Sequence, residues 1–548
     1  MAKDDKAKDS RPKGLLPPRQ AATAIGLMPP RQAATAMARL PKGMRDVGPA
    51  EVRGMERMLA KIRGVYELYG FEPLATSALE FSDALGKFLP DQERPNAGVF
   101  SFQDEDGDWL SLRYDLTAPL ARYVAENFDR LPKPYRRYQV GSVWRNEKPG
   151  PGRFREFVQF DADTVGTDNV AADAEICMMA ADALEAIGVE KGLFVINVNN
   201  RLLLDGLRDD LGLGGGEYDT KWLRVMRAID KYDRLGRDAV YELLTTGRKD
   251  ASGDFTEGAG LTAEQSERIR NALYDSEGLF LTKISDDVLR ANNDMQLTHG
   301  GFFVDNKKKL AFWRKELASS DLGIAGVEAL ERMFTYFEAA RFGSNRIRFN
   351  QTVVRGLEYY TGPVFEAELT FQIAGDDGLP VRFGSVGGGG RYDGLVSRFT
   401  GQPVPATGFS IGVSRLYAAL QALGKTGAET ARGPVLVLVM DKTDLGSFQA
   451  LAAKLRAAGI PAEMYVGSSG MKAQMKYADK RGSPCVVIQG GDEKAKGEVT
   501  IKDLIAGAEA AATITDRAQW TEGRPAQVSV PEADMVRTVQ EILARHSR

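Results

Sequence analysis

The sequence predicts an α+β protein in which helices accompany a sheet, followed by a smaller and separate α/β domain. Two strands at 137–144 and 154–166 are joined by a turn-rich loop, as in a hairpin. A mostly helical stretch comes next, and strands then return at 346–354, 364–371 and 381–386. After residue 434, strands and helices alternate, which is typical of an α/β domain. The length of 548 residues leaves room for three or four domains at about 150 residues each.

The other elements follow from local patterns in chain order. Apolar residues at helical spacing within 49–69, between Pro49 and Gly70, predict the first helix. The next expected elements are an extended stretch at 71–79, a strand at 109–113, helices at 116–128 and 171–187, and a strand at 193–199. Residues 201 to 340 carry mostly helical patterns, and another helix opens near 413. The last part should contain strands at 434–440, 462–466 and 484–488 and helices at 446–458 and 471–481.

The N-terminal segment 1–39 differs from the rest of the chain. Eight Lys or Arg and three Asp give it a net charge of +5, and PPRQAATA occurs twice, at 17–24 and 29–36. Because few large apolar residues interrupt it, it predicts a disordered basic tail. A nonspecific nucleic-acid-binding arm and a targeting segment are the alternatives. A second irregular stretch, GKTGAETARG at 424–433, predicts a linker.

The composition limits the chemistry available to the chain. Lys and Arg total 72 against 75 Asp and Glu, and no apolar run approaches the roughly 18 residues of a membrane-spanning helix. The only His and Cys residues are far apart in the sequence: His299, His546, Cys177 and Cys485. They predict no zinc site, no disulfide framework and no His-based triad. We therefore expect a reducing compartment, the cytoplasm, and chemistry carried by carboxylates, Arg, Lys, Tyr and backbone groups, without a metal held by His or Cys.

Common nucleotide-binding loops do not explain the sequence. GKT at 424–426 lacks the first Gly of a P-loop and the strand before it, and GGGGR at 387–391 is not a GxGxxG loop that opens a helix. Polar residues instead mark the predicted strands. Gln159, Asp161 and Asp163 have the same parity, so they share one face of the sheet. Because charged groups in a sheet are costly unless they are paired or engaged by a ligand, internal ion pairing and ligand binding both remain open.

Four segments carry motifs in a characteristic order. They are VGSVWRNEKPGPGRFREFVQFDADTVG at 140–166, VRGLEYYTGPVFE at 354–366, GGGGRYDGLV at 387–396 and ATGFSIGVSRL at 406–416. The first and last resemble motifs 2 and 3 of class II aminoacyl-tRNA synthetases, and the middle two resemble the signatures of histidyl-tRNA synthetases. The resemblance runs from Leu40 to the C-terminus. It implies a class II antiparallel sheet flanked by helices, histidine–tRNA ligase activity with ATP and Mg²⁺, and a homodimer that binds histidine tRNA.

The resemblance implies ATP-binding roles. Arg145 matches the motif 2 arginine at the α-phosphate, and Arg415 matches the motif 3 arginine at the γ-phosphate. Phe157 matches the ring that stacks on adenine, and Glu147 the residue that contacts the adenine amino group. Arg355 stands where the family places an extra arginine beside the reacting carboxylate and phosphate. Because charge builds on the α-phosphate oxygens, Arg145 and Arg355 are the expected catalytic residues.

The resemblance also implies a histidine site. It comprises Asp115, Thr117, Gln159, Asp163, Arg355, Tyr359, Tyr360 and Tyr392. Asp115, Thr117 and Gln159 match the acceptors of the α-ammonium. Asp163 and Tyr360 lie where the family contacts the two imidazole nitrogens, one a donor and one an acceptor. For Tyr392, an ordinary packing role is the alternative.

Four positions depart from the family pattern, and two basic residues are expected at the tRNA acceptor end. Ser77 stands where motif 1 has Pro, Asp163 where many bacterial members have Glu, Ser414 where Glu is common, and Gly150 where many have Gln. Because the Asp163 side chain is shorter, a water or a backbone shift is expected to complete its contact with the ligand. Lys148 and Arg153 flank the glycines and prolines of the motif 2 loop and are expected to contact tRNA phosphates.

The expected organisation follows from these motifs. It is a tail at 1–39, catalytic parts at 40–200 and 341–423, a mainly helical insertion at 201–340, a linker at 424–433 and an anticodon-binding domain at 434–548. Two other functions stay open. One is an inactive paralogue that serves as regulatory subunit of ATP phosphoribosyltransferase, and the other is a pure RNA-binding protein. The retained motif residues and the full C-terminal part favour the ligase.

Overall fold

The computed structural model describes residues 38–85, 98–148, 154–250, 253–273, 281–283, 302–354, 356, 359–374, 380–426, 432–513 and 526–546. Several expectations fall outside these residues: the tail up to residue 37, Arg153, His299, Arg355 and linker residues 427–431. The chain divides into two compact units, made mainly of Met55–Thr426 and Gly427–Arg548. Each is described by itself.

The first unit is built on an eight-stranded sheet with the order β1-β5-β6-β15-β14-β13-β7-β12. Its strands are β1 (Glu72–Pro73), β5 (Tyr135–Trp144), β6 (Glu156–Val165), β7 (Phe194–Asn200), β12 (Ile347–Phe349), β13 (Pro363–Ala374), β14 (Pro380–Arg391) and β15 (Ala406–Gly412). The six central strands pair antiparallel, and β1 and β12 run parallel to their neighbours. The predicted antiparallel sheet is therefore confirmed.

One face of this sheet packs against α1 (Pro49–Leu68), α4 (Val170–Ala186) and α13 (Val413–Ala422). Even-numbered residues of β6 point to this side, and the ring of Phe160 lies 4.9 Å from that of Tyr66 on α1. Both Phe160 and Tyr66 are fully buried. α4 is buried on most sides because it lies between the sheet and α11 (Asp321–Ala339).

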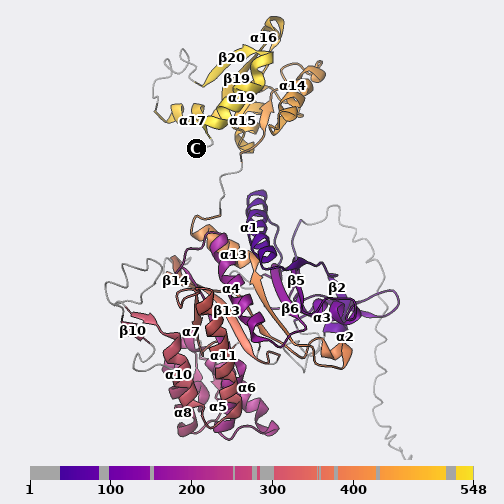
Figure 1. Cartoon of the computed structure of the whole chain (residues 1–548). Helices are drawn as coiled ribbons and strands as arrows, with labels where there is room; N and C mark the ends of the chain where they lie inside the picture. The colour runs from indigo at the N-terminus through magenta and orange to yellow at the C-terminus, as the bar shows by residue number, and fades with distance from the viewer. Residues whose placement is uncertain are drawn as a thin grey trace, which may run out of the picture. The chain divides into compact units, whose positions relative to one another are not determined.

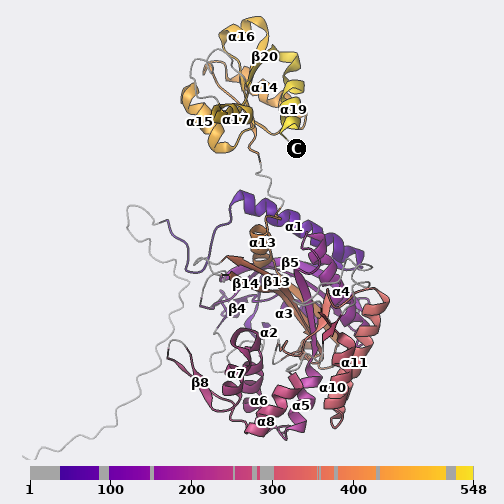
Figure 2. The ribbon, with the colours of Figure 1, turned by 90° about the vertical axis from the view of Figure 1, so that its left-hand side faces the viewer.

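The stretch from Arg201 to Ala339 is mainly helical in its described part, and its helices gather beside the sheet (Figures 1 and 2). Besides α11 it contains α5 (Arg201–Asp210), η2 (Gly216–Tyr218), α6 (Asp219–Ile229), α7 (Tyr232–Leu244), β8 (Gly247–Lys249), β9 (Phe255–Glu257), α8 (Ala263–Leu273), β10 (Leu281–Lys283), β11 (Phe302–Val304) and α10 (Asn306–Glu316). α5 and α11 approach closely at two glycines, since a Cβ on Gly206 would lie 2.6 Å from Cα of Gly323. The buried side chains of this stretch continue the core of the sheet.

The opposite face of the sheet carries α3 (Thr117–Glu126), whose buried residues pack on β5, β6 and the segment after β14. Beside it lies a small antiparallel sheet of order β2-β4-β3. The elements of this region are β2 (Leu79–Phe81), α2 (Ser82–Leu85), β3 (Ser101–Gln103), β4 (Trp109–Leu112) and α12 (Ser397–Thr400).

The second unit is a five-stranded sheet of order β17-β16-β18-β19-β20 with helices around it. Its elements are β16 (Val435–Val437), α14 (Leu445–Ala457), β17 (Ala462–Met464), α15 (Met471–Arg481), β18 (Cys485–Ile488), α16 (Gly491–Lys496), β19 (Glu498–Asp503), α17 (Leu504–Thr513), β20 (Gln527–Pro531), η3 (Glu532–Asp534) and α19 (Met535–Arg545). It has its own hydrophobic clusters on both faces of the sheet. Cys177 in the first unit and Cys485 in the second are buried and unpaired. Among the described helices, none combines the length and apolar character needed to cross a membrane.

The structure corrects one expected strand end. The third returning strand was expected to stop at residue 386, but β14 continues through all four glycines to Arg391. The glycines stay in the ladder, where Gly387, Gly388, Gly389 and Gly390 pair with residues of β15. Glycine weakens a strand in isolation, so its local propensity underestimates a strand that is held between two neighbours.

Candidate active site

A polar floor lies on the α3 side of the sheet. In the β5–β6 pair, Arg137 is opposite Asp163, Gln139 opposite Asp161, and Gly141 opposite Gln159. Alternate residues and directly opposed partners share a face, so these side chains form three successive rows on one side. The next strand continues the rows with Gly408, Ser410 and Gly412.

Glycines hollow this floor beside its acidic residues. A Cβ on Gly408 would lie 2.0 Å from Oδ1 of Asp163, and a Cβ on Gly390 would lie 3.0 Å from the Tyr360 ring. Any larger residue at these positions would displace the carboxylate or the ring. Gly390 of the GGGG segment and Gly408 of β15 therefore leave room for the neighbouring side chains, which is a reason for glycine at a close approach.

Asp163 is fixed on two sides. Its Oδ2 lies 2.8 Å from Nη2 of Arg137 in a buried ion pair, and the hydroxyl of Tyr392 donates to its Oδ1 at 2.5 Å. Nη2 of Arg137 also donates to the carbonyl of Leu116 at 3.0 Å. Burial raises the pKa of Asp163, while Arg137 and the Tyr392 hydroxyl oppose the rise. Arg137 therefore keeps the carboxylate oriented and favours its charged form.

Asp161 and Gln159 complete the acidic side of the floor. Both are at least nine-tenths buried, and Oδ1 of Asp161 and Oε1 of Gln159 have no hydrogen-bond partner among the residues that the structure describes. Burial, and then the neighbouring Asp163, raise the pKa of Asp161 to about 7, against the opposing effect of Arg137. Unpaired buried acceptors are costly, so these oxygens point to a ligand that brings N–H groups.

Two further predicted residues lie at the start of α3: Asp115 just before the helix and Thr117 as its first residue. Oδ1 of Asp115 accepts from the backbone N–H groups of Thr117 and Ala118, at 3.1 and 2.9 Å, so the carboxylate caps the helix. Burial raises the pKa of Asp115, while these backbone bonds and Arg145 oppose it. One oxygen is thereby committed to the helix and the other remains available for a ligand.

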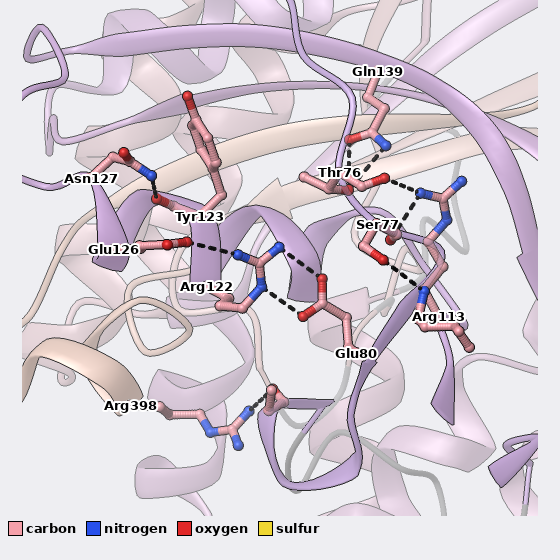
Figure 3. A network of polar contacts seen from close by, with 12 residues as sticks. Thr76, Ser77, Glu80, Arg113, Arg122, Tyr123, Glu126, Asn127, Gln139 and Arg398 are labelled. Atoms are coloured by element: carbon pink, nitrogen blue, oxygen red, sulfur yellow. Dashed lines mark hydrogen bonds and ion pairs between the residues drawn. The ribbon is translucent and has the colours of Figure 1, made fainter. Parts of the chain in front are cut away.

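A network of arginines holds this region in place (Figure 3). Nη1 of Arg113 donates to the carbonyls of Thr76 and Ser77 at 2.8 and 3.1 Å, while its Nε donates to Ser142 in β5. The guanidinium of Arg122 on α3 contacts both oxygens of the buried Glu80, at 2.6 and 2.9 Å. The motif 1 segment is thus tied both to the sheet and to the helix that carries Asp115.

Three tyrosines lie beside the floor. The rings of Tyr359 and Tyr360 are 4.2 Å apart, and Tyr359 donates to the Tyr360 hydroxyl at 2.9 Å. Tyr392 lies 6.5 Å from Tyr359 and is buried. Because the Tyr392 hydroxyl also donates a hydrogen bond to Asp163, its role is polar as well as one of packing.

The predicted ATP residues lie on the sheet and on α13. The Arg145 guanidinium lies 5.1 Å from the Phe157 ring, and its Nε donates to the carbonyl of Tyr114 at 3.2 Å. Arg415 is exposed, and its Nη2 donates to the carbonyl of Phe383 at 2.6 Å. Glu147 and Lys148 are exposed at the end of the β5 strand.

The described residues thus bring together Asp115, Thr117, Gln159, Asp163 and the three tyrosines. Arg355 and Arg153 lie outside the described residues.

Sequence reasoning missed Arg137, although its parity with Gln139 and its position opposite Asp163 in the predicted hairpin could have identified it. It also missed the buried pair of Arg391 and Asp173, in which Nε of Arg391 lies 3.0 Å from Oδ2 of Asp173. That pair anchors the end of β14 to α4, next to Tyr392.

The fold is shared with solved aminoacyl-tRNA synthetases. The structure matches a histidyl-tRNA synthetase from Nostoc sp. with a TM-score of 0.65 and 27% identity, covering 93% of this chain and all of that one. A histidyl-tRNA synthetase from S. aureus shares the fold at a TM-score of 0.55 and 18% identity, covering 92% of this chain and 99% of that one.

Sequence comparison identifies the family. Residues 43–235 and 247–416 match the histidyl-tRNA synthetase family model, and residues 435–540 match the anticodon binding domain. Histidine–tRNA ligases of Bradyrhizobium diazoefficiens and Methylocella silvestris are 55% and 56% identical to this chain; both cover 92% of it, and the matches span 96% and 97% of those proteins. The chain belongs to the histidyl-tRNA synthetase family.

Proposed function

We propose that the chain is a histidine–tRNA ligase, which activates histidine with ATP to histidyl-adenylate and transfers it to histidine tRNA. The observation that carries the proposal is the polar floor, found in a chain of this family. In the floor, Arg137 and Tyr392 hold Asp163, and buried acceptor oxygens without a hydrogen-bond partner among the described residues lie next to it. A small ligand with several N–H donors fits that floor, and histidine has them.

The α-ammonium of histidine is held by Asp115, Thr117 and Gln159. Asp115 has one oxygen left beside its helix cap, and Oε1 of Gln159 has no partner among the described residues. The imidazole lies towards Asp163, Tyr360 and the other tyrosines. Because the site's own polar groups would be left unpaired by an apolar analogue, such an arrangement discriminates strongly.

MgATP is the second substrate, with the phosphates supplying most of the oxygen ligands of Mg²⁺. Arg145 binds the α-phosphate, and its contacts with Tyr114 and Phe157 support this role because they limit the freedom of its side chain. Phe157 stacks on adenine, Glu147 contacts the adenine amino group, and Arg415 binds the γ-phosphate. The histidine carboxylate attacks the α-phosphorus and pyrophosphate leaves; Arg145 and Arg355 stabilise the charge that grows on the phosphate.

The tRNA is bound by several parts of the chain. Lys148 and Arg153 contact the acceptor end, and the insertion at 201–340 lies along the acceptor arm. In the anticodon-binding domain, the basic groups that best fit phosphate contacts are exposed on one face of α15 at helical spacing: Lys472, Lys476 and Lys480. By contrast, Arg481 on the same helix is paired with Glu463 at 3.1 Å.

The protein acts as a homodimer in the cytoplasm. One face of the small β2-β4-β3 sheet is apolar: Phe81, Leu110 and Phe102 form one row across it, next to Leu79 and Leu112. Phe81 is 53% exposed and Phe102 46%. A contiguous apolar patch of this kind is a typical interface, and it lies in the motif 1 region that the class uses for dimer contacts. A second copy of the chain is therefore its occupant.

Light scattering coupled to gel filtration tests the dimer. Phe81→Glu combined with Phe102→Glu should give a monomer at micromolar concentration. Trp109→Glu is the matched control, because Trp109 is 49% exposed but has the parity of the opposite face of the small sheet. A double variant that remains dimeric would rule out this face.

Histidine-dependent exchange of pyrophosphate into ATP tests the activity. The ligase requires exchange with histidine and none with other amino acids, followed by charging of histidine tRNA. A regulatory paralogue would show neither reaction, and a pure RNA-binding protein would bind tRNA without exchange. Absence of exchange in the folded protein would therefore refute the proposal.

A further inference from the structure

The strongest unassigned feature is the carboxylate of Asp161. It lies on β6 between Gln159 and Asp163, on the same face, with Gln139 opposite on β5 and Ser410 opposite on β15. Its side chain is 2% exposed, and its Oδ1 has no hydrogen-bond partner in the described part of the chain. A buried carboxylate with an unpaired oxygen, within the floor of a binding site, requires a donor from a ligand or a water.

The acceptors of the floor can be matched to the donors of histidine. The α-ammonium has three N–H groups, and Asp115, Thr117 and Gln159 supply three acceptors for them. The remaining donor of a neutral histidine is the single N–H of its imidazole. Oδ1 of Asp163 accepts from the Tyr392 hydroxyl, and its Oδ2, although it has no hydrogen bond in the described part of the chain, lies 2.8 Å from Nη2 of Arg137 in an ion pair. Oδ1 of Asp161 has no hydrogen bond, and among the described residues Asp161 has no ion pair either, so it is the carboxylate of the floor that most needs this donor.

We propose that Asp161 accepts the hydrogen bond from the imidazole N–H of bound histidine, and that Asp163 positions the site through Arg137 and Tyr392. The inference rests on the proposed ligase function and deepens it. It also explains the short Asp163: where many bacterial relatives reach the ligand with a longer Glu, this chain supplies a second carboxylate two residues earlier on the same face.

The electrostatics of the site agree with this assignment. Asp161 is surrounded by Asp163 on its own strand, Arg137 on β5 and Asp115 at the start of α3, which are the titratable groups that act on it. Arg137 lies 2.8 Å from Asp163 and is therefore committed mainly to that carboxylate. Asp161 has no such cation among the described residues, so an N–H donor from the ligand would stabilise its carboxylate more than that of Asp163. A hydrogen bond to a charged acceptor is stronger than one to a neutral acceptor.

A substrate analogue separates this role from a structural one. In β-(4-thiazolyl)alanine, sulfur takes the place of the Nε2–H while the Nδ1 acceptor and the amino acid backbone remain; for a donor at Nδ1–H, β-(5-thiazolyl)alanine is the matching thiazole analogue. The measurement is pyrophosphate exchange with histidine and with the thiazole analogue, for the wild type, Asp161→Ala, Asp161→Asn, Asp163→Asn, Ser410→Ala and Thr164→Val. The quantity compared is the ratio of kcat/KM for histidine to that for the analogue.

We expect the wild type to prefer histidine strongly, and Asp161→Ala to lower this ratio about 10- to 100-fold, because the lost bond involves a charged acceptor. Asp161→Asn keeps the shape and should lower the ratio by a smaller factor, so the test does not depend on a variant that fails to fold. Thr164→Val, on the opposite face of β6, is the control and should leave the ratio unchanged, whereas Ser410→Ala removes a neighbouring hydroxyl that helps to lower the pKa of Asp161 and should lower the ratio less than Asp161→Ala does.

Two outcomes would overturn the role of Asp161, and a third would overturn the ligase function on which it rests. Equal losses for both substrates in the Asp161 variants would overturn the proposal in favour of a structural role or a bridging water. A ratio that collapses in Asp163→Asn but not in Asp161→Ala would assign the contact to Asp163 and overturn it as well. If the wild type shows no histidine-dependent exchange at all, it is the ligase proposal that fails.

Discussion

Asp161→Asn should stabilise the folded protein at pH 8 while it weakens substrate selection. Burial and the adjacent Asp163 raise the pKa of Asp161 from 3.8 to about 7. Between these two values the folded protein holds a proton that the unfolded chain has released. Stability therefore falls as pH rises from about 4 to about 7, and above pH 7 the folded state carries the full cost of the buried charge. Asparagine does not titrate and avoids that cost.

The magnitude follows from the same values. A difference of about 3 pH units at 1.36 kcal/mol each gives a ceiling of about 4 kcal/mol at pH 8. The asparagine amide must itself find partners in a buried site, so a net gain on the order of 1–3 kcal/mol is expected. For a large domain this corresponds to a rise in Tm of a few degrees.

Thermal unfolding followed by circular dichroism between pH 5 and pH 8.5 measures the effect. The Tm of the variant should exceed that of the wild type at pH 8, and the gap should close towards pH 5. Thr164→Val, a change without a titrating group on the opposite face of β6, serves as the control. A variant that is less stable at pH 8, or a gap that does not change with pH, would refute the reasoning.

Three further predictions concern the ligase reaction. Arg355→Ala should reduce pyrophosphate exchange about 10²–10³-fold without lowering Tm, and Arg355→Lys should rescue only partly, because an ammonium cannot reproduce the planar fork; near-normal exchange would contradict the role assigned to this residue. A fragment of residues 1–430 should form adenylate but charge tRNA poorly, because the second unit has its own core; full charging would contradict the role of that unit. A chain that starts at Leu40 should activate histidine normally, and a loss confined to charging at high salt would indicate that the tail steers tRNA.

The sheet and most of its helices could be predicted from local sequence, and the reason is visible in particular segments. The β5–β6 hairpin has strong alternation and a loop of Pro and Gly, and α4 has an unbroken apolar pattern, so both followed from the residues alone. The last strands of the second unit, β19 and β20, were missed, and in the small sheet the strand β4 was expected at 109–113 but its partners β2 and β3 were not. β2 and β3 are only three residues long, which is too short for a periodic signal.

The sequence could predict which residues face the site, but not which of them contact one another. Parity placed Gln159, Asp161 and Asp163 on one face, and the structure has them there. The partner of Asp163 could not be chosen from the sequence alone, because that choice depends on the register between two strands. A slip of one residue would have put Arg136 opposite Asp163 and turned Arg137 to the other face of the sheet.

Five glycines lie among the side chains of the polar floor. At Gly141, Gly388, Gly390, Gly408 and Gly412 the surface of the floor depends on strand spacing and pleat, and not on side-chain rotamers, which interconvert on the nanosecond timescale. The cost appears in the unfolded chain, where each glycine has about 0.5–1 kcal/mol more conformational freedom to lose than alanine. The glycines thus lower the stability of the fold, and in return the binding surface has its shape before the substrate binds.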